Sequence, residues 1–468
     1  MTFDSVLTLD SAFVAGALAS LMRGRGGTDR PFTRAIIDSR ISQSGDLFVA
    51  LPGEHTDGHD HAAAAITAGA TGCLLARIVD GTEAASRFYV DDPLAALQTL
   101  GAAWRAALPN LEVVAVTGNV GKTTTKLIAA QLLAPRYRVE VNPLNYNNEI
   151  GVPLCLLELR GDIERAVIEH GMYTTGEITL LTTWTRPRTG IVLNVGPVHL
   201  ERAGSLKAIA LAKRELIEAL PADGHALLNI DDPIVAAMAP HTPATVTTFG
   251  TAAAAQIRGH SVKSAGPEGF SFTLEIDGDQ RQVQVPLPGV HLLSNVLAGI
   301  AAAVVDEVPL DQIAQAAEQL AIPLRLSVTA LTEKITLLDD TYNSNPASMH
   351  AALDLLAQMP GRHVALLGDM LELGNEETAA HEEIGQRVAS EVDLLLTIGS
   401  LGQRFGDIAN AAGVETQHLE TKEHATEALA DRLEPGDAVL IKASNALHLE
   451  TVVSDLKARM QTAAEERS

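Results

Sequence analysis

The stretch Thr117-Gly118-Asn119-Val120-Gly121-Lys122-Thr123-Thr124-Thr125 follows a continuous apolar run, Glu112 to Thr117, and precedes a helical stretch from about Lys122 to Leu133. Glycines let backbone N–H groups and the helix start face an anion, while the lysine and the next hydroxyl suit phosphate oxygens and Mg²⁺. This strand–loop–helix order favours an ATP or GTP site over a chance turn. The residues expected to contact the nucleotide are Gly118, Asn119, Val120, Gly121, Lys122, Thr123 and Thr124.

The loop is shorter than a full Walker loop, because Val116 stands where that pattern has its first glycine. A motor or a GTPase switch is therefore disfavoured. A phosphate loop by itself still leaves hydrolase, kinase and ligase open, so the rest of the chain must decide between them.

Further apolar runs after the loop predict a doubly wound parallel sheet. They are separated by helical or loop segments and lie at residues 166–168, 190–193 and 226–230. Between Thr245 and Pro288 the pattern alternates instead, which indicates an antiparallel excursion. The expected central domain covers residues 110–321.

Two more α/β segments flank this centre. Residues 1–109 mix short apolar runs with turns such as Pro52-Gly53, and residues 322–468 repeat strand-like runs at 335–338, 363–367, 394–398 and 438–441. A length of 468 residues also fits about three domains at roughly 150 residues each. The predicted fold is α/β with a small N-terminal domain, a central doubly wound P-loop-type ATPase domain and a C-terminal Rossmann-like domain.

The composition of the chain limits the kinds of partner and compartment that can be expected. The formal net charge is 34 − 58 = −24, which repels nucleic acid, and only 3% of residues are aromatic. Cys73 and Cys155 are too few for a disulfide framework, which favours a reducing compartment. We expect both side chains to be buried. The apolar stretch from Ala12 to Met22 follows acidic residues rather than the basic start of a signal peptide, and no segment is long enough to span a membrane. We therefore expect a cytoplasmic protein that has no membrane span and does not bind nucleic acid.

Three polar residues follow successive strands of the predicted central sheet. Glu169 ends one apolar run, His199 follows the next, and Lys213 lies on the helical stretch after it. Taken singly, each could have no role in a site: Glu169 could be a solvated strand end, His199 a loop histidine and Lys213 a surface lysine. Because the carboxyl ends of parallel strands share one edge, their common placement instead predicts a metal and catalytic site beside the loop.

Together these residues resemble the ATP-dependent Mur ligases of peptidoglycan synthesis, over nearly the whole chain. The N-terminal segment carries Asp38-Ser39-Arg40 and Asp57-Gly58-His59, which are similar to the family's uridine-nucleotide domain. Residues 145–153 and the stretch Gly368 to Gly374, with His381, resemble the subgroup that couples D-alanyl-D-alanine to UDP-N-acetylmuramoyl-tripeptide. The resemblance implies an ATP-dependent carboxylate–amine ligase, with these two small molecules as substrates.

The resemblance also implies roles for single residues. Catalysis would fall to Lys122, Glu169, His199 and Lys213, and Mg²⁺ would be bound by Thr123, Glu169, His199 and a carbamylated Lys213. ATP would further contact His291, Asn295, Arg325 and Asp340. The substrates would contact Ser39, Arg40, Asn147, Asn148, Tyr342 and Asn343. The three domains would bind the uridine substrate, ATP and the incoming dipeptide, with the last one closing on ATP, and we expect a monomer.

Two departures from the family pattern keep alternatives open. Tyr173 stands where the family has asparagine, and Asn445 stands where it has an arginine that could grip a phosphate or carboxylate. A ligase of the same fold with another acceptor or amine is one alternative. A catalytically silent nucleotide-binding paralogue is the other, although clustered charges have no physical use in such a protein.

Overall fold

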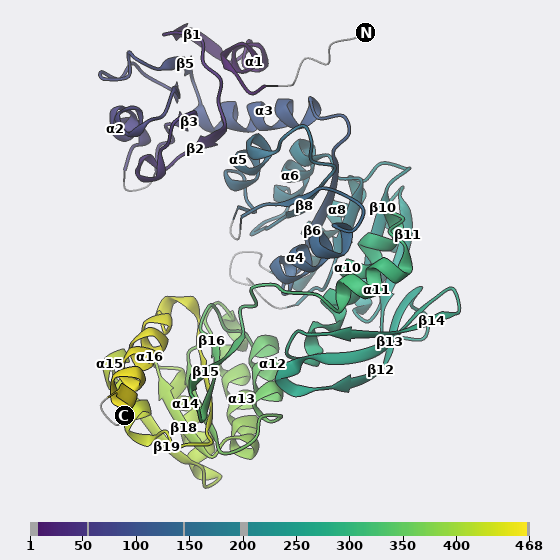
Figure 1. Cartoon of the computed structure of the whole chain (residues 1–468), viewed down its shortest axis with the longest axis vertical. Coiled ribbons are helices and arrows are strands. Elements are labelled where there is room, and N and C mark those ends of the chain that lie inside the picture. The colour runs from purple at the N-terminus through teal and green to yellow at the C-terminus, as the bar shows by residue number, and fades with distance from the viewer. Residues whose placement is uncertain (1–7, 54–55, 144–145, 197–204, 466–468) are drawn as a thin grey trace. The chain divides into compact units, whose positions relative to one another are not determined.

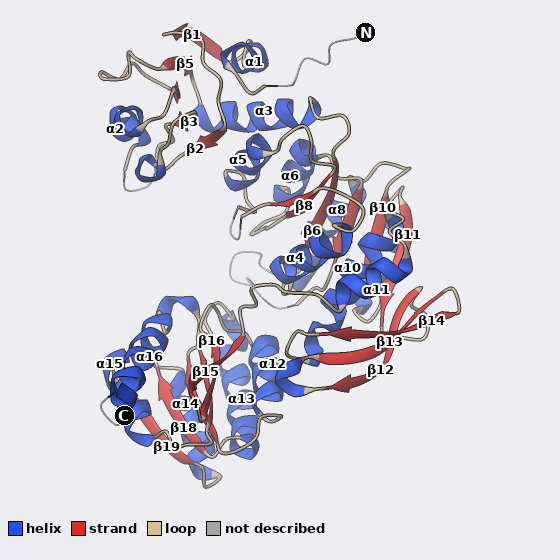
Figure 2. Ribbon diagram, in the orientation of Figure 1, coloured by secondary structure: helices blue, strands red, loops and turns tan. Residues whose placement is uncertain are grey.

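The computed structural model describes residues 8–53, 56–143, 146–196 and 205–465 and contains three β-sheets flanked by helices (Figures 1 and 2). This architecture confirms the predicted three-domain α/β fold. The chain forms two compact units. The first comprises residues 1–195, 210–249 and 298–313, and the second comprises 196–209, 250–297 and 314–468. Within the described residues no helix is both long and apolar enough to cross a membrane.

The N-terminal sheet has the strand order β1-β5-β4-β3-β2, in which β1 runs antiparallel to β5 and the other pairs are parallel. Both faces of its inner strands are buried, so these strands read as apolar runs. The elements of this part are α1 (Ser11–Ala17), β1 (Met22–Gly26), β2 (Arg34–Ile36), η1 (Ser39–Ile41), β3 (Asp46–Val49), η2 (Gly58–His61), α2 (Ala62–Ala68), β4 (Gly72–Leu75), β5 (Ser86–Val90) and α3 (Pro93–Ala106).

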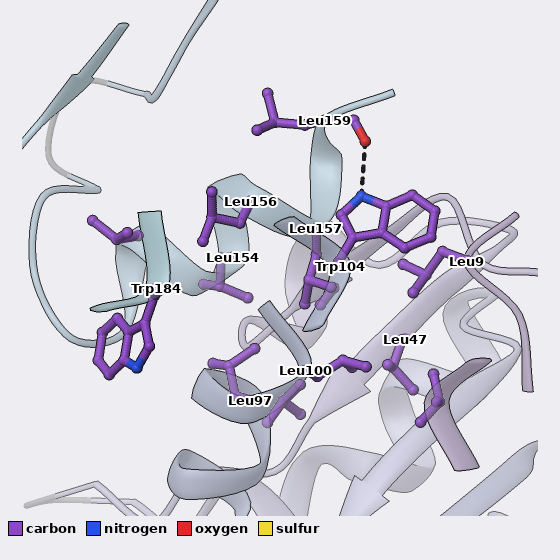
Figure 3. Close-up of a cluster of buried hydrophobic side chains, with 14 of the residues drawn as sticks. Leu9, Leu47, Leu97, Leu100, Trp104, Leu154, Leu156, Leu157, Leu159 and Trp184 are labelled. Atoms are coloured by element: carbon purple, nitrogen blue, oxygen red, sulfur yellow. Dashed lines mark hydrogen bonds between the residues drawn. The ribbon is translucent and has the colours of Figure 1, made fainter. Parts of the chain in front are cut away.

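Helix α3 joins the N-terminal sheet to the central one. Asp92 caps its start by accepting from the Leu94 and Ala95 amides, and Pro93 fits the first helical position. Its apolar face packs against α5 (Gly151–Glu158) and α6 (Glu177–Thr185). The indole of Trp104 donates to the Leu159 carbonyl at 2.8 Å, within a cluster of leucines drawn from the N-terminal and central parts of the unit (Figure 3). One hydrophobic core therefore spans the N-terminal and central parts of the first unit.

The central sheet of the first unit has the order β11-β10-β9-β6-β8-β7 with every pair parallel. Because β6 lies between β8 and β9, the chain leaving these three strands emerges at one edge. Its strands are β6 (Glu112–Thr117), β7 (Val139–Val141), β8 (Arg165–Glu169), β9 (Thr189–Val192), β10 (His225–Asn229) and β11 (Thr245–Gly250). The further helices around it are α4 (Lys122–Leu133), α8 (Leu206–Glu218), α9 (Pro233–Ala236), η3 (Ala239–His241), α10 (Leu293–Val305) and α11 (Leu310–Ala317).

One expectation about this sheet is wrong. The antiparallel excursion was placed from Thr245 onward, yet β11 pairs in parallel with β10 and extends the doubly wound sheet. Its alternating threonines look like a half-exposed hairpin strand because this strand is only partly buried. The antiparallel segment starts later, at β12 (Ile257–Ser264), which pairs with β13 (Phe270–Ile276) and then β14 (Asp279–Val285).

The C-terminal sheet has the order β15-β16-β20-β17-β18-β19, with β15 antiparallel and the other strands parallel. Helices cover both of its faces, as in a Rossmann-like domain (Figure 2). Its strands are β15 (Ser327–Thr332), β16 (Ile335–Asp340), β17 (His363–Gly368), β18 (Leu394–Ile398), β19 (Glu415–Leu419) and β20 (Ala438–Lys442). The helices of this second unit are η4 (Gly266–Glu268), η5 (Val290–Leu292), α12 (Pro346–Leu356), η6 (Gly374–Glu376), α13 (Glu377–Glu391), α14 (Gly402–Ala411), α15 (Lys422–Arg432), η7 (Asn445–Leu447) and α16 (Glu450–Glu465).

Candidate active site

The phosphate loop makes a tight turn between β6 and α4. Gly121 has φ = +84° at the N-cap of α4, a conformation that favours glycine, and it brings no side chain of its own to the start of the helix. A Cβ on Gly118 would lie 2.9 Å from Cβ of Leu193, so the loop passes close to the end of β9. The two glycines therefore set the path of a loop whose helix start can receive an anion.

Asn194 clamps this loop from the neighbouring strand end. Its Oδ1 accepts from the Asn119 amide at 2.9 Å and from the Val120 amide at 3.0 Å, and its Nδ2 donates to the Val120 carbonyl at 3.0 Å. Asn194 was not among the predicted site residues. Its position directly after an apolar run is the signal that could have identified it.

Lys122 begins α4 and folds back over the loop. Its Nζ donates to the Gly118 carbonyl at 2.9 Å and to the Asn119 carbonyl at 3.3 Å. The positive charge is thus held beside the loop's backbone, where it can meet phosphate oxygens. Thr124, in the first turn of the same helix, is half-buried.

Thr123 and Glu169 are brought together from two elements of the central sheet. The Thr123 hydroxyl donates to Glu169 Oε2 at 2.7 Å, and both side chains are buried. Glu169 ends β8 in register with Val116 of β6, which places its carboxylate at the carboxyl edge beside the loop. A hydroxyl and a carboxylate in contact at this edge form a pair of hard oxygen ligands.

Asn147 and Asn148 line the segment that leads into α5. The Asn147 amide donates to Glu169 Oε1 at 2.9 Å, so each oxygen of that carboxylate has a described donor. The Asn148 Oδ1 accepts from the Gly151 amide at 2.9 Å, where α5 begins. Of the two predicted substrate contacts, only Asn147 touches the Thr123–Glu169 pair.

Lys213 lies buried on α8. Burial, reinforced by the positive charge of Lys122, lowers the pKa of its ammonium well below the ordinary value. A neutral amine is favoured in such a place. His199, the remaining predicted metal ligand, lies outside the described residues.

The oxygen ligands present fit Mg²⁺. Across residues 8–53, 56–143, 146–196 and 205–465, no group of three His, Cys, Asp or Glu side chains is arranged to hold a metal ion. The Thr123 hydroxyl, the Glu169 carboxylate and nucleotide phosphates are oxygen ligands of the kind that Mg²⁺ takes, usually with several waters. Lys213 could join them only in an anionic form, such as a carbamate.

In the second unit, Asp340 is held by a buried lysine. Asp340 ends β16 in register with Lys442, which ends β20, and Lys442 Nζ lies 2.6 Å from Asp340 Oδ2. The same ammonium donates to the Asn343 carbonyl at 2.8 Å. Burial raises the pKa of Asp340 and lowers that of Lys442, and their mutual attraction opposes both shifts. Lys442 was not predicted as a site residue.

The other predicted residues of this unit lie at its surface. The guanidinium of Arg325 stacks on the exposed ring of Tyr342, 4.0 Å from its centroid. Asn343 is exposed and caps its own turn by accepting from the Ser344 amide. His291 is exposed on η5, and Asn295 is half-buried on α10.

Ser39 and Arg40 sit on η1 of the N-terminal sheet. The guanidinium of Arg40 forms a bidentate ion pair with Asp38, in which Nη2 lies 2.7 Å from Oδ2. This pair lowers the pKa of the Asp38 carboxyl to about 2. The Arg40 side chain remains 87% exposed, so this cation is available to a ligand. Ser39 is half-buried beside it.

Comparison with protein families accounts for all three sheets. Residues 33–103 match the Mur ligase family catalytic domain, residues 116–303 match the Mur ligase middle domain, and residues 324–445 match the Mur ligase glutamate ligase domain. The chain belongs to the Mur ligase family. It is an ATP-dependent, amide-bond-forming ligase, as the family resemblance implied.

Named relatives of this Mur ligase share one subgroup. A protein of Synechocystis sp. named UDP-N-acetylmuramoyl-tripeptide--D-alanyl-D-alanine ligase is 38% identical, over 91% of this chain and 92% of that protein. The Escherichia coli protein of the same name is 35% identical over 92% and 95%, respectively.

Solved structures of the same subgroup resemble the whole Mur ligase chain. MurF from Acinetobacter baumannii superposes with a TM-score of 0.87 at 28% identity, covering 97% of this chain and 99% of that one. MurF ligase from Thermotoga maritima in complex with ADP gives a TM-score of 0.78 at 27% identity, covering 92% and 98%.

Proposed function

We propose that this Mur ligase joins D-alanyl-D-alanine to UDP-N-acetylmuramoyl-tripeptide with ATP, forming the UDP-muramoyl-pentapeptide. The observation that carries the proposal is the Thr123–Glu169 contact beside the Lys122 loop, the arrangement that phosphoryl transfer needs. The substrates follow from relatives that carry this name at 38% and 35% identity over more than nine-tenths of the chain.

The chemical problem is that a free carboxylate is a poor electrophile. In the proposed reaction, a carboxylate oxygen of the tripeptide attacks the γ-phosphorus of ATP, the bond to the bridging oxygen breaks, and ADP leaves. The dipeptide's neutral amine then attacks the acyl phosphate carbon. The tetrahedral intermediate collapses, inorganic phosphate leaves with the former carboxylate oxygen, and the amine proton is lost as the amide forms.

The loop residues would stabilise the negative charge that develops during this transfer. Lys122 and the backbone amides of the loop would bind the β- and γ-phosphates and offset the repulsion between two anions. Asn194 holds two of the loop's amides in place. Thr123 and Glu169 would hold Mg²⁺, which when bound supplies charge neutralisation across the phosphates.

Lys213 fits the carbamylated lysine that the family resemblance implies. Its lowered pKa leaves an amine that can react with CO₂, since the neutral amine is the nucleophile. The product carries a negative charge in place of a positive one. The carbamate would serve as a further oxygen ligand of Mg²⁺, and His199 would help to bind the metal.

The remaining predicted contacts divide among the proposed domains. Ser39 and Arg40, in residues 1–109, would meet the uridine nucleotide. Asn147, in residues 110–321, would meet the tripeptide, and His291 with Asn295 would meet the adenine. In residues 322–468, Arg325 and Asp340 would serve ATP, and Tyr342 and Asn343 would serve substrate. We further propose a cytoplasmic monomer.

A substrate panel tests the proposal. ADP release is measured with UDP-muramoyl-tripeptide and, in turn, D-alanyl-D-alanine, D-alanyl-D-lactate, a single amino acid or no acceptor. We expect turnover only with the tripeptide and the dipeptide together, and a loss of at least about 100-fold in Lys122→Ala. Turnover without the dipeptide, or normal turnover in Lys122→Ala, would overturn it. Preference for another amine would favour the same-fold alternative and would draw attention to Tyr173, which is exposed.

A further inference from the structure

We propose that Lys126 and Asn142 form a positioning relay that holds Glu169 and Asn147 in place for the metal–nucleotide complex. Both residues are buried and contact the segments that carry Glu169 and Asn147, so they would act through those two residues. This inference rests on the proposed ATP site and adds two residues to its machinery.

The first link of the relay is a buried lysine on the helix of the phosphate loop. Lys126 lies one turn after Lys122 on α4 and is 1% exposed. Its ammonium donates to the Asn142 carbonyl at 2.7 Å. Burying an ammonium is costly unless its hydrogens find acceptors, so this contact strongly fixes the position of the Asn142 backbone.

The second link is Asn142 itself, which is also 1% exposed and follows β7 directly. Its Oδ1 accepts from the Glu169 amide at 3.0 Å, and its Nδ2 donates to the Tyr146 carbonyl at 2.7 Å. One side chain therefore fixes the last residue of β8 and the segment that carries Asn147.

The relay ends on the carboxylate that would bind Mg²⁺. Asn147 Nδ2 lies 2.9 Å from Glu169 Oε1, and the Asn147 carbonyl accepts from the Gly171 amide at 2.8 Å. Thr123 holds the other carboxylate oxygen. A Cβ on Gly171 would lie 2.9 Å from Asn147 Oδ1, so the two segments are in close contact. Glu169 is thus fixed through its amide and both oxygens.

Helix α4 contributes to the position of Glu169 in two ways. Thr123 and Lys126 both belong to α4, so the helix that presents the phosphate loop also sets the Glu169 carboxylate, directly and through Asn142. The geometry between the loop and the metal ligand then depends on one rigid element. Groups that orient metal ligands in this way typically contribute 10- to 100-fold to metal affinity or activity.

The test measures how strongly magnesium assists nucleotide binding. The dissociation constant of the non-hydrolysable analogue AMP-PNP is measured on the full chain, once with Mg²⁺ and once with EDTA. The ratio of the two constants is compared among variants. We expect Asn142→Ala to reduce this ratio about tenfold, with the constant in EDTA changed less than about twofold. Lys126→Met should act in the same direction.

A matched control separates this role from general stability. Asp306→Asn breaks the buried Arg165–Asp306 pair, whose atoms lie 2.6 Å apart at the opposite end of the same strand, β8. It should lower the melting temperature and leave the magnesium ratio unchanged. Where Asn142→Ala does not fold, Lys126→Met carries the test alone.

The outcomes are distinct. A magnesium ratio within about twofold of the parent in the folded relay variants would overturn the relay, and so would an equal fall of the ratio in Asp306→Asn. If the parent protein has the same AMP-PNP dissociation constant with Mg²⁺ and with EDTA, the proposed function is contradicted instead.

Discussion

Lys442 and Asp340 form a buried ion pair in which Nζ lies 2.6 Å from Oδ2, at the facing ends of the paired strands β20 and β16. The lysine is 0% exposed, so water cannot replace its partner. The pair fixes the start of the segment that continues to Tyr342 and Asn343, because the same ammonium binds the Asn343 carbonyl. A residue that the family resemblance assigns to ATP is therefore also a structural anchor.

Breaking this pair from one side should strongly destabilise the protein. Asp340→Asn leaves a buried ammonium without its counter-charge, and we expect a loss of about 3 kcal/mol in the free energy of unfolding, measured by urea denaturation. The double variant Asp340→Asn with Lys442→Met should lose less, since no charge is left unpaired. Glu415→Gln, which breaks an exposed pair with Arg432 in the same unit, should cost under about 1 kcal/mol. Equal losses in Asp340→Asn and Glu415→Gln would contradict this account.

Removing the clamp on the phosphate loop should weaken ATP binding. Asn194→Ala releases the Asn119 and Val120 amides, and we expect the dissociation constant for ATP to rise about tenfold, as for the loss of one to two hydrogen bonds. Asn194→Asp keeps an acceptor for both amides but adds a negative charge beside the phosphates. It should therefore bind ATP more weakly than Asn194→Ala, which calorimetry can measure. Tighter binding by the aspartate variant would show that the loop does not face phosphate.

Lys213 should react with carbon dioxide. Burial and the positive charge of Lys122 lower the pKa of its ammonium well below the ordinary value, which increases the share of neutral, nucleophilic amine. Protein incubated with ¹³C-bicarbonate should give one carbamate ¹³C NMR signal that is missing in Lys213→Met. Lys207, on the same helix α8, provides the control, since Lys207→Met should keep the signal. A signal that survives in Lys213→Met would exclude this lysine as the carbamylated one.

His381 should make the second unit sensitive to acid. Its Nε2 accepts from the Met370 amide at 3.0 Å while Nδ1 donates to the Glu377 carbonyl, and the contact with the Met370 amide needs the neutral ring. Burial lowers the pKa of His381 below its ordinary value of 6.5. Its contribution to stability is present above pH 6.5 and is lost as the pH falls, because the unfolded chain then binds a proton that the folded chain rejects.

Replacing that histidine should reduce the pH dependence of stability. The free energy of unfolding, measured at pH 7.5 and pH 5, should differ less in His381→Gln than in the parent. His424→Gln, at an exposed histidine of the same unit, should leave the difference unchanged. An unchanged difference in His381→Gln would show that the ring is protonated without cost.

Much of the fold could be predicted because buried parallel strands have a clear pattern. The apolar runs at Glu112–Thr117 and Leu394–Ile398 coincide with β6 and β18. Strands with exposed faces give no such run, so β1 and β19 went unpredicted. The direction of β11 was wrong for the same reason, since its partly exposed threonines resemble those of a hairpin strand.

The candidate site was predictable where chemistry dictates residue type and position together. The spacing of Thr123 and the strand-end position of Glu169 both follow from the phosphate loop and the sheet edge. Lys126, Asn142 and Asn194 did not stand out, because a polar side chain acquires its role from backbone groups that are distant in sequence. No local pattern indicates which carbonyl or amide such a side chain will meet.

In the proposed reaction, ATP phosphorylates the tripeptide's carboxylate before the dipeptide attacks. The most direct measurement uses UDP-muramoyl-tripeptide whose terminal carboxylate carries ¹⁸O at both oxygens, with ATP and D-alanyl-D-alanine, and mass spectrometry of the phosphate released. An acyl phosphate intermediate predicts one ¹⁸O atom in each phosphate formed, in equal amount to the pentapeptide. Phosphate that contains no ¹⁸O while the pentapeptide accumulates would contradict the account.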